Sequence, residues 1–144
     1  MKAILGQSKS TVDVKGRMNF PAKFRDELGE AFIVAKAIDN NVKCLKVYST
    51  ADWNALSEKL NELPQNKTAP LLRGIFGTAE PAEPDKQGRI ILPLYLRKYA
   101  EIESEVVVVG LGARAEIWSK ANWEKATDDE SMDMLVDIAE EIGF

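Results

Sequence analysis

The sequence contains no histidine and a single cysteine, Cys44, among its 144 residues. The absence of histidine excludes Ser-His-Asp and Cys-His catalysis and the common zinc sites that contain histidine. One cysteine cannot form a disulfide within the chain, which favours a cytoplasmic location. The acidic residues form no pair at a spacing typical of a catalytic site. We therefore predict no enzymatic activity, no metal and no cofactor.

The chain also lacks any long apolar run. No stretch approaches the length needed to cross a membrane, and the first nine residues are too short and too polar for a secretory signal. Hydrophobic residues make up 45% of the chain and charged residues 29%, a balance typical of soluble globular proteins. We expect one domain with an adequate core, no membrane partner and no small-molecule substrate.

The net charge is −4, but the charges are distributed unevenly along the chain. The stretch from Glu124 to Phe144 contains eight acidic residues and one basic residue, a charge of −7. The rest of the chain therefore carries +3. A local basic surface on an acidic protein can attract DNA to one place.

One motif occurs twice, with an offset of 72 positions. The first copy runs from Asp13 to Arg25 and the second from Asp85 to Arg97, and both fit the pattern D-x-x-G-R-x-x-x-P-x-x-x-R. A single D-x-x-G-R occurs by chance in many proteins, but two aligned copies with the same downstream pattern indicate an internal duplication.

Each copy predicts a strand, a tight turn, a second strand and a short helix. Gly16 and Gly88 allow a positive φ in the turn. Asp13 and Asp85 can accept hydrogen bonds from the turn amides. The short apolar segments that follow predict half-buried strands, and a proline then begins each helix. No rule of turn chemistry requires the basic residues, so they are either solvated charges or contacts for a partner.

Periodicity and turn residues predict the other elements. We expect strands at 4–12, 31–37, 43–48, 105–109 and 115–118, and short helices at 22–28 and 94–100. Ser49 should cap a helix that ends near Leu63, and residues 64–70 should connect the two halves. The segment 71–77 fits a helix or a strand equally well. Trp53 and Trp123, each four residues after a serine, are predicted to lie in the core.

The acidic C-terminal stretch is predicted to form a helix with one apolar side. The apolar positions are Met132, Leu135, Val136, Ala139 and Ile142. Three interpretations remain open for this side: packing on its own domain, contact with another subunit, or a negative tail that modulates DNA binding.

The duplicated motif resembles the AbrB-like, swapped-hairpin DNA-binding module. Two copies, each followed by a Ser-x-x-x-Trp helix start, resemble the MraZ family of bacterial transcriptional regulators, and the similarity covers about Leu5 to Trp123. This implies an α+β, mainly β fold: a pseudo-two-fold, duplicated swapped-hairpin β-barrel with peripheral helices. We expect a single domain, 1–144, with its halves at 1–63 and 71–123 and a C-terminal acidic helix at 124–144.

The resemblance also implies a function. Ring-like homo-oligomers would bind promoter-proximal direct repeats in double-stranded DNA and regulate the operon for cell division and cell-wall synthesis, including the protein's own gene. A cytoplasmic, nucleoid-associated location follows. The implied DNA-binding residues are Lys15, Arg17, Lys23, Arg25, Lys86, Arg89 and Arg97, and the structural turn residues are Asp13, Gly16, Asp85 and Gly88.

Two other functions remain open. One is an AbrB-like antitoxin or regulator with a protein partner. The other is an oligomeric scaffold that does not bind DNA, in which Arg17 and Arg89 would form structural ion pairs.

Overall fold

The computed structural model describes the backbone of residues 2–144 and the side chains of these residues except 129–132. Its described strands form one antiparallel sheet in the order β1-β7-β8-β4-β3-β5 and a second that pairs β2 with β6. The strands are β1 (Gln7–Thr11), β2 (Arg17–Asn19), β3 (Phe32–Asp39), β4 (Val42–Ser49), β5 (Glu80–Ala82), β6 (Arg89–Ile91), β7 (Glu105–Gly110) and β8 (Ala115–Ser119). The helices are α1 (Ala22–Leu28), α2 (Thr50–Asn61), α3 (Gln65–Gly74), α4 (Leu94–Tyr99), α5 (Lys120–Ala126) and α6 (Asp129–Ile142), and a 3-10 turn, η1 (Phe76–Thr78), precedes β5.

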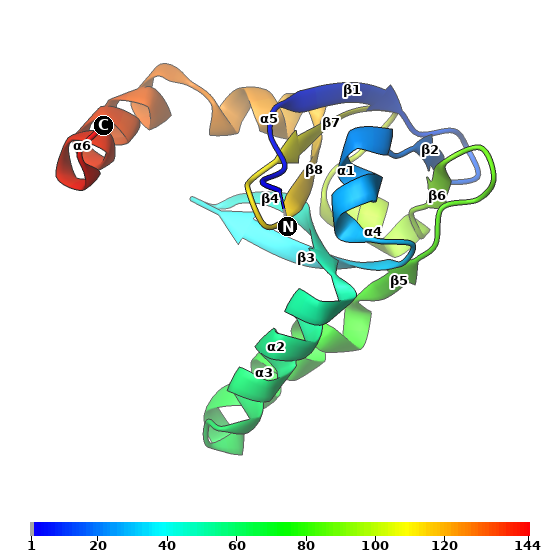
Figure 1. The fold of residues 1–144 in the computed structure, drawn as a ribbon, viewed down its shortest axis with the longest axis horizontal. Helices are drawn as coiled ribbons and strands as arrows, with labels where there is room; N and C mark the ends of the chain where they lie inside the picture. Colours follow the sequence, from blue (N-terminus) through cyan, green and yellow to red (C-terminus); the bar gives the residue numbers. More distant parts are fainter. Residues whose placement is uncertain (1) are drawn as a thin grey trace.

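The two halves of the chain exchange strands. β1 from the first half pairs with β7 from the second, and β5 from the second half pairs with β3 from the first. β2 and β6, the strands that follow the two turns, pair with each other, with Met18 opposite Ile90. Each half therefore supplies a strand that the other lacks (Figure 1). This arrangement confirms the predicted fold class, a duplicated AbrB-like swapped-hairpin barrel.

Both halves contribute to one apolar core. The ring of Phe20 lies 4.7 Å from that of Phe32 and 6.3 Å from that of Phe24, measured between ring centroids. Met18 and Ile90, at the centre of the β2–β6 ribbon, are each 1% exposed and belong to the same cluster. The core thus holds this ribbon from beneath and leaves its other face to solvent.

The repeated serines begin equivalent helices, as predicted. The hydroxyl of Ser49 accepts a hydrogen bond from the backbone N–H of Asp52 at 3.1 Å, and that of Ser119 accepts from Asn122 at 3.1 Å. A serine at this position satisfies one of the free amides of the first helical turn. The predicted short helices also form, as α1 and α4.

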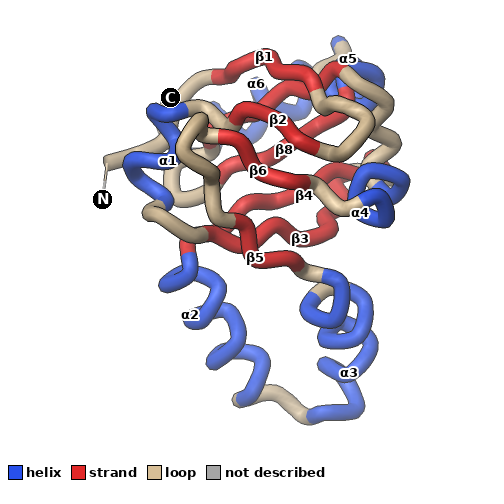
Figure 2. Tube along the Cα trace, turned by 90° about the vertical axis from the view of Figure 1, so that its right-hand side faces the viewer, coloured by secondary structure: helices blue, strands red, loops and turns tan. Residues whose placement is uncertain are grey.

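A helical hairpin of α2 and α3 projects from the barrel (Figures 1 and 2). The expected connector at 64–70 is helical and not a loop, because Pro64 directly precedes α3 and residues 65–70 form its first turns. Pro64 has φ −59° and its carbonyl accepts from the N–H of Lys67 at 3.0 Å, so this proline starts a helix instead of a loop. The ambiguous segment 71–77 forms the last turn of α3, to Gly74, and then enters the 3-10 turn η1.

Neither tryptophan predicted for the core is fully buried. Trp53 is half-buried on the helical hairpin and stacks on Phe76, with ring centroids 4.3 Å apart. Trp123 is also half-buried and packs against a small cluster that contains Trp118 and Cys44. Trp118, at the end of β8, is the tryptophan that the core encloses, at 2% exposed.

The C-terminal segment forms two helices, not one, and α6 extends away from the barrel (Figure 1). Leu135 and Val136 are each 53% exposed and Ile142 is 68% exposed. The interpretation that this helix packs on its own domain is therefore wrong. The side chain of Met132, part of the predicted apolar side, lies outside the described residues. None of the described helices combines the length and apolar character that a membrane span needs.

Candidate nucleic-acid interface

The two D-x-x-G-R turns have the same hydrogen bonds. Asp13 Oδ1 accepts from the backbone N–H groups of Lys15 and Arg17, both at 2.9 Å. In the second turn, Asp85 Oδ1 accepts from the backbone N–H groups of the residues two and four positions after it, also at 2.9 Å. The glycines have φ 87° and 79°, a conformation that favours glycine. Aspartate and glycine therefore build the turn in both halves.

Arg17 and Arg89 also take part in their turns. Arg17 Nε donates to Asp13 Oδ2 at 2.7 Å, and Arg89 Nε donates to Asp85 Oδ2 at 3.0 Å. The prediction that nothing local requires these arginines is wrong, because each one completes the hydrogen bonding of its turn aspartate. The first pair is about 40% exposed, so it adds little stability. No hydrogen bond within the described part of the chain uses the Nη groups of these arginines, which leaves them for a partner.

Arg25 and Arg97 lie beneath the turn of the opposite half. Arg25 Nε donates to the carbonyl of Phe20 at 3.0 Å. In the second half, Arg97 Nε donates to the carbonyl of Leu92 at 2.8 Å. A Cβ atom at position 88 would lie 2.8 Å from Arg25 Nη2, and one at position 16 would lie 3.1 Å from Arg97 Nη2. Each of these arginines therefore connects the helix of one half to the turn of the other and helps to position it.

Hydrogen bonds lower the pKa of both turn aspartates below the ordinary value of 3.8. The largest contribution at Asp13 is the backbone N–H of Arg17, and at Asp85 it is the backbone N–H of Arg89. Because the pKa is lower in the folded than in the unfolded chain, the carboxylates stabilise the fold above the unfolded value. This stabilisation is lost as the pH falls through the folded value.

Replacing both aspartates, Asp13→Asn with Asp85→Asn, is expected to make the free energy of unfolding less dependent on pH in acid. The asparagines still accept from the turn amides but have no charge to lose. Urea unfolding between about pH 6 and about pH 2.5 measures the slope. Glu58→Gln, at an exposed site on α2, should keep the wild-type slope. Equal slopes for wild type and the double variant would contradict the inference that these two carboxylates stabilise the fold.

Between the two turns, the β2–β6 ribbon presents a face to solvent, and Figure 2 looks onto it. The register places Arg17 opposite Ile91 and Asn19 opposite Arg89. Because alternate residues of a strand share a face, these four side chains lie on the outer face, while the residues between them are buried. Asn19 and Ile91 are absent from the predicted DNA-binding set. The alternation around the apolar Met18 could have indicated them, but only once the register was known.

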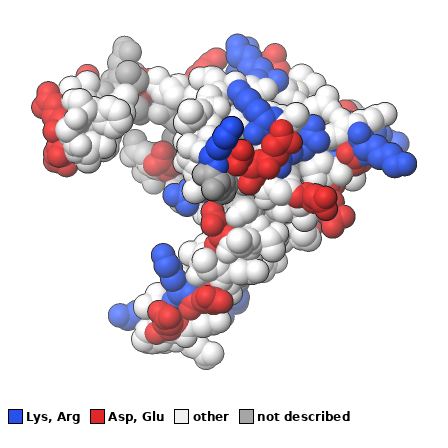
Figure 3. Space-filling model, viewed as in Figure 1, with Lys and Arg blue, Asp and Glu red and all other residues white. Residues whose placement is uncertain are grey.

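The predicted lysines lie near this ribbon. Lys15 and Lys86 are exposed in the two turns, and Lys23 is exposed on α1. Figure 3 shows lysine and arginine side chains at the end of the molecule that carries the turns, and acidic side chains on α6 at the opposite end. The fold therefore brings the basic residues of both motif copies to one side and places the acidic helix far from them.

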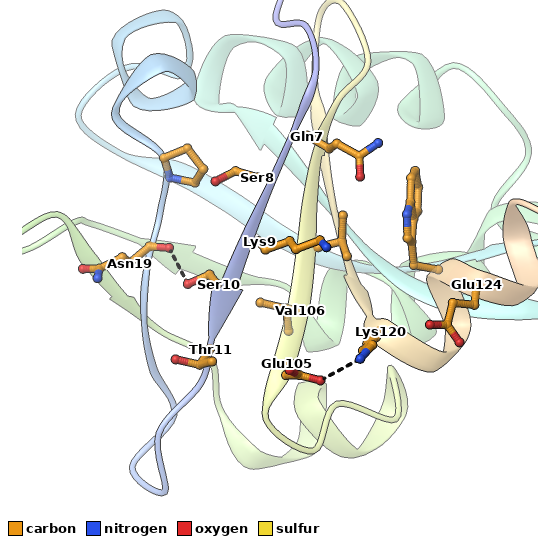
Figure 4. Close-up of a pocket in the computed structure, with 13 residues that line it drawn as sticks. Gln7, Ser8, Lys9, Ser10, Thr11, Asn19, Glu105, Val106, Lys120 and Glu124 are labelled. Atoms are coloured by element: carbon orange, nitrogen blue, oxygen red, sulfur yellow. Dashed lines mark hydrogen bonds and ion pairs between the residues drawn. The ribbon is translucent and has the colours of Figure 1, made fainter.

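A groove of about 670 Å³ follows the edge strand β1 (Figure 4). On its wall the Ser10 hydroxyl donates to the backbone carbonyl of Asn19 at 3.2 Å, while the Asn19 amide points away from the groove. Lys120 Nζ lies 3.4 Å from Glu105 Oε2.

Within the described residues, no group of three histidine, cysteine or acidic side chains could hold a metal ion.

Comparison with known proteins decides the family. The family model described as "MraZ protein, putative antitoxin-like" matches the chain twice, at residues 3–72 and 75–142. The chain belongs to the MraZ family. Each of the two matches contains one copy of the duplicated motif, Asp13–Arg25 in the first and Asp85–Arg97 in the second.

Similar MraZ proteins align over nearly their whole length. "Transcriptional regulator MraZ" of Caldicellulosiruptor saccharolyticus is 44% identical, over 98% of this chain and 99% of the relative. The protein of the same name from Alkaliphilus oremlandii is 43% identical, over 97% and 99%. That of Caldanaerobacter subterraneus subsp. tengcongensis is 46% identical, over 87% and 89%.

Proposed function

We propose that this chain is a transcriptional regulator that binds double-stranded DNA in a sequence-specific manner through the β2–β6 ribbon and its two flanking turns. The observation that carries the proposal is the pair of equivalent arginines, Arg17 and Arg89, on one solvent-exposed ribbon whose opposite face is anchored in the core. The names of the MraZ relatives support the regulatory role.

The chemistry of the ribbon suits the DNA major groove, which is wide enough for a two-stranded β-ribbon. The free Nη groups of an arginine can donate to guanine O6 and N7 or to a phosphate. The carboxylate bound to Nε restricts the orientation of each guanidinium, which lowers the entropy lost on binding. Lys15, Lys86 and Lys23 supply phosphate contacts, and Arg25 and Arg97 hold the turns in place.

The proposal extends to assembly and target. A ring-like homo-oligomer would present several ribbons to promoter-proximal direct repeats, and the regulated genes would be the operon for cell division and cell-wall synthesis, including the protein's own gene. This target follows from the family resemblance. A regulator of this kind acts on the chromosome and would be associated with the nucleoid in the cytoplasm.

Arg17→Ala and Arg89→Ala are expected to fold normally and to lose DNA binding. Each ion pair is well exposed, so its removal costs little stability, whereas each lost base contact costs about 1–3 kcal/mol of binding free energy per site. Gel shifts with the DNA upstream of the chain's own gene measure binding, and circular dichroism melts measure folding.

The control is Arg73→Ala, at an exposed site near the end of α3, which removes the same charge far from the ribbon. It should bind DNA like the wild type. Variants at positions 17 and 89 that bind normally, or a wild-type protein without affinity for any duplex, would overturn the proposal. The second outcome would favour a protein-binding role, for which the exposed apolar side of α6 is the supporting observation.

A further inference from the structure

The outer face of the β2–β6 ribbon is symmetric in its arginines but not in its other two side chains. The pseudo-two-fold axis relates Arg17 to Arg89, and it relates Asn19 to Ile91. Asn19 is exposed, and Ile91 is 65% exposed. Two equivalent corners of the ribbon therefore carry an amide in one half and a branched alkyl group in the other.

We propose that Asn19 and Ile91 determine the base specificity of this interface, with Asn19 contacting an adenine and Ile91 contacting the methyl group of a thymine. The inference rests on the DNA binding proposed above. An asparagine amide can donate to adenine N7 and accept from its N6 amino group, and the thymine methyl is the apolar group of the major groove. These two chemistries match the two side chains.

The positions of the four side chains fit a short stretch of duplex. Residues two apart on a strand are separated by about 6.6–6.8 Å. Base pairs are stacked about 3.4 Å apart along each DNA strand, so the ribbon face spans about two base-pair steps. Arg17, Arg89 and Ile91 also line one common hollow of about 240 Å³, together with Glu83 and Asp85. Because the register places Asn19 opposite Arg89 and Ile91 opposite Arg17, the amide and the alkyl group are close enough to the arginines to contact neighbouring base pairs of the same site.

The backbone around Asn19 is held in place, while its side chain remains available. The Ser10 hydroxyl binds the Asn19 carbonyl at 3.2 Å, and Figure 4 shows the amide directed away from that contact. No hydrogen bond to this amide occurs among the described residues. The buried Met18 next to it fixes the strand from beneath. A contact from a held backbone costs less ordering than one from a flexible loop.

The asymmetry also has a consequence for the assembly. A ribbon with two identical halves would bind a site equally well in either orientation. With asparagine at one corner and isoleucine at the other, only one orientation places the amide on adenine and the alkyl group on the methyl. Subunits that face the same way in an oligomer would then select boxes in the same orientation, which are direct repeats.

The test is selection of bound duplexes from a pool with randomised boxes, using the full chain. Asn19→Ala should lose the preference for adenine at one position, by roughly 5- to 150-fold, and keep the other preferences. Ile91→Ala should lose a preference for thymine at another position by a smaller factor. Leu63→Ala is the control, because Leu63 is an apolar side chain of similar exposure, 52%, at the far end of the helical hairpin.

Uracil provides a second control on the DNA side, since it lacks only the methyl group of thymine. Replacing that thymine by uracil should weaken the wild type and leave Ile91→Ala unchanged. If the wild type selects a box but both variants keep all its preferences, this inference is overturned and the proposed function stands. If the wild type selects no sequence at all, the proposed function fails, and this inference fails with it.

Discussion

Gly16→Val is expected to lower the free energy of unfolding by about 4 kcal/mol or more, a large part of the stability of a domain of this size. Two effects combine at this site. The backbone has φ 87°, where a β-branched residue is strained. In addition, a Cβ atom there would lie 2.4 Å from the carbonyl oxygen of Leu92, which is backbone of the opposite half. That oxygen already accepts a hydrogen bond from Arg97 Nε at 2.8 Å, and as a backbone atom directly after β6 it cannot move aside as the end of a side chain can.

Two other glycines separate these effects. Gly112 has φ 82° with nothing within 4 Å of a built Cβ, so Gly112→Val should show only the backbone strain, about 1–3 kcal/mol. At Gly88 the obstacle is the end of the Arg25 side chain, which can shift, so Gly88→Val should lie between the other two. Urea unfolding at one fixed protein concentration gives the order, since oligomers depend on concentration. Equal losses of unfolding free energy at all three sites would show that the close approach of the Leu92 carbonyl to Gly16 adds nothing to the backbone strain.

Tight DNA binding is expected to require two or more boxes in the same orientation, with affinity about 10²- to 10⁴-fold above that for one box. The whole chain carries a net charge of −4, and Figure 3 shows acidic side chains among the basic ones, so one subunit should bind weakly. A symmetric oligomer presents identical ribbons at fixed spacing. Once one ribbon is bound, the next binds at a high effective concentration if a second box lies within reach.

Duplexes with one, two and three boxes measure this effect directly. A further duplex, with the spacing changed by half of the ~10 bp helical turn, places the second box on the wrong side and should bind like a single box. Binding should also weaken steeply with salt, because each added subunit adds phosphate contacts. A single box that binds as tightly as three, or a half-turn shift without effect, would mean that each subunit binds DNA independently.

Local chemistry alone determined much of the fold. Gly16 and Gly88 indicated the turns, Ser49 and Ser119 indicated the helix starts, and all four features appear in the structure. Such features depend on the φ angle of one residue or on one side-chain bond to a neighbouring amide, which a short stretch of sequence specifies. The motif, present twice, also indicated the duplicated fold.

Other features depended on contacts between residues far apart in the chain, and here the sequence failed or was silent. Pro64 fits a linker or a helix start equally well by itself. In the structure it precedes α3, and Phe76, two residues after the end of α3, stacks on Trp53 of α2. Aromatic residues at helical spacing predicted a core position for Trp53, but packing placed it on the projecting hairpin.

The candidate site was predicted in part. The duplicated motif by itself pointed to Arg17 and Arg89, because their positions recur. Only the tertiary structure paired β2 with β6 and so placed Asn19 and Ile91 on the same outer face as these arginines. Strand register between two halves of a chain is set by core packing and by hydrogen bonds between distant residues, such as that from Leu92 N–H to the Gly16 carbonyl at 2.7 Å. No local pattern contains that information.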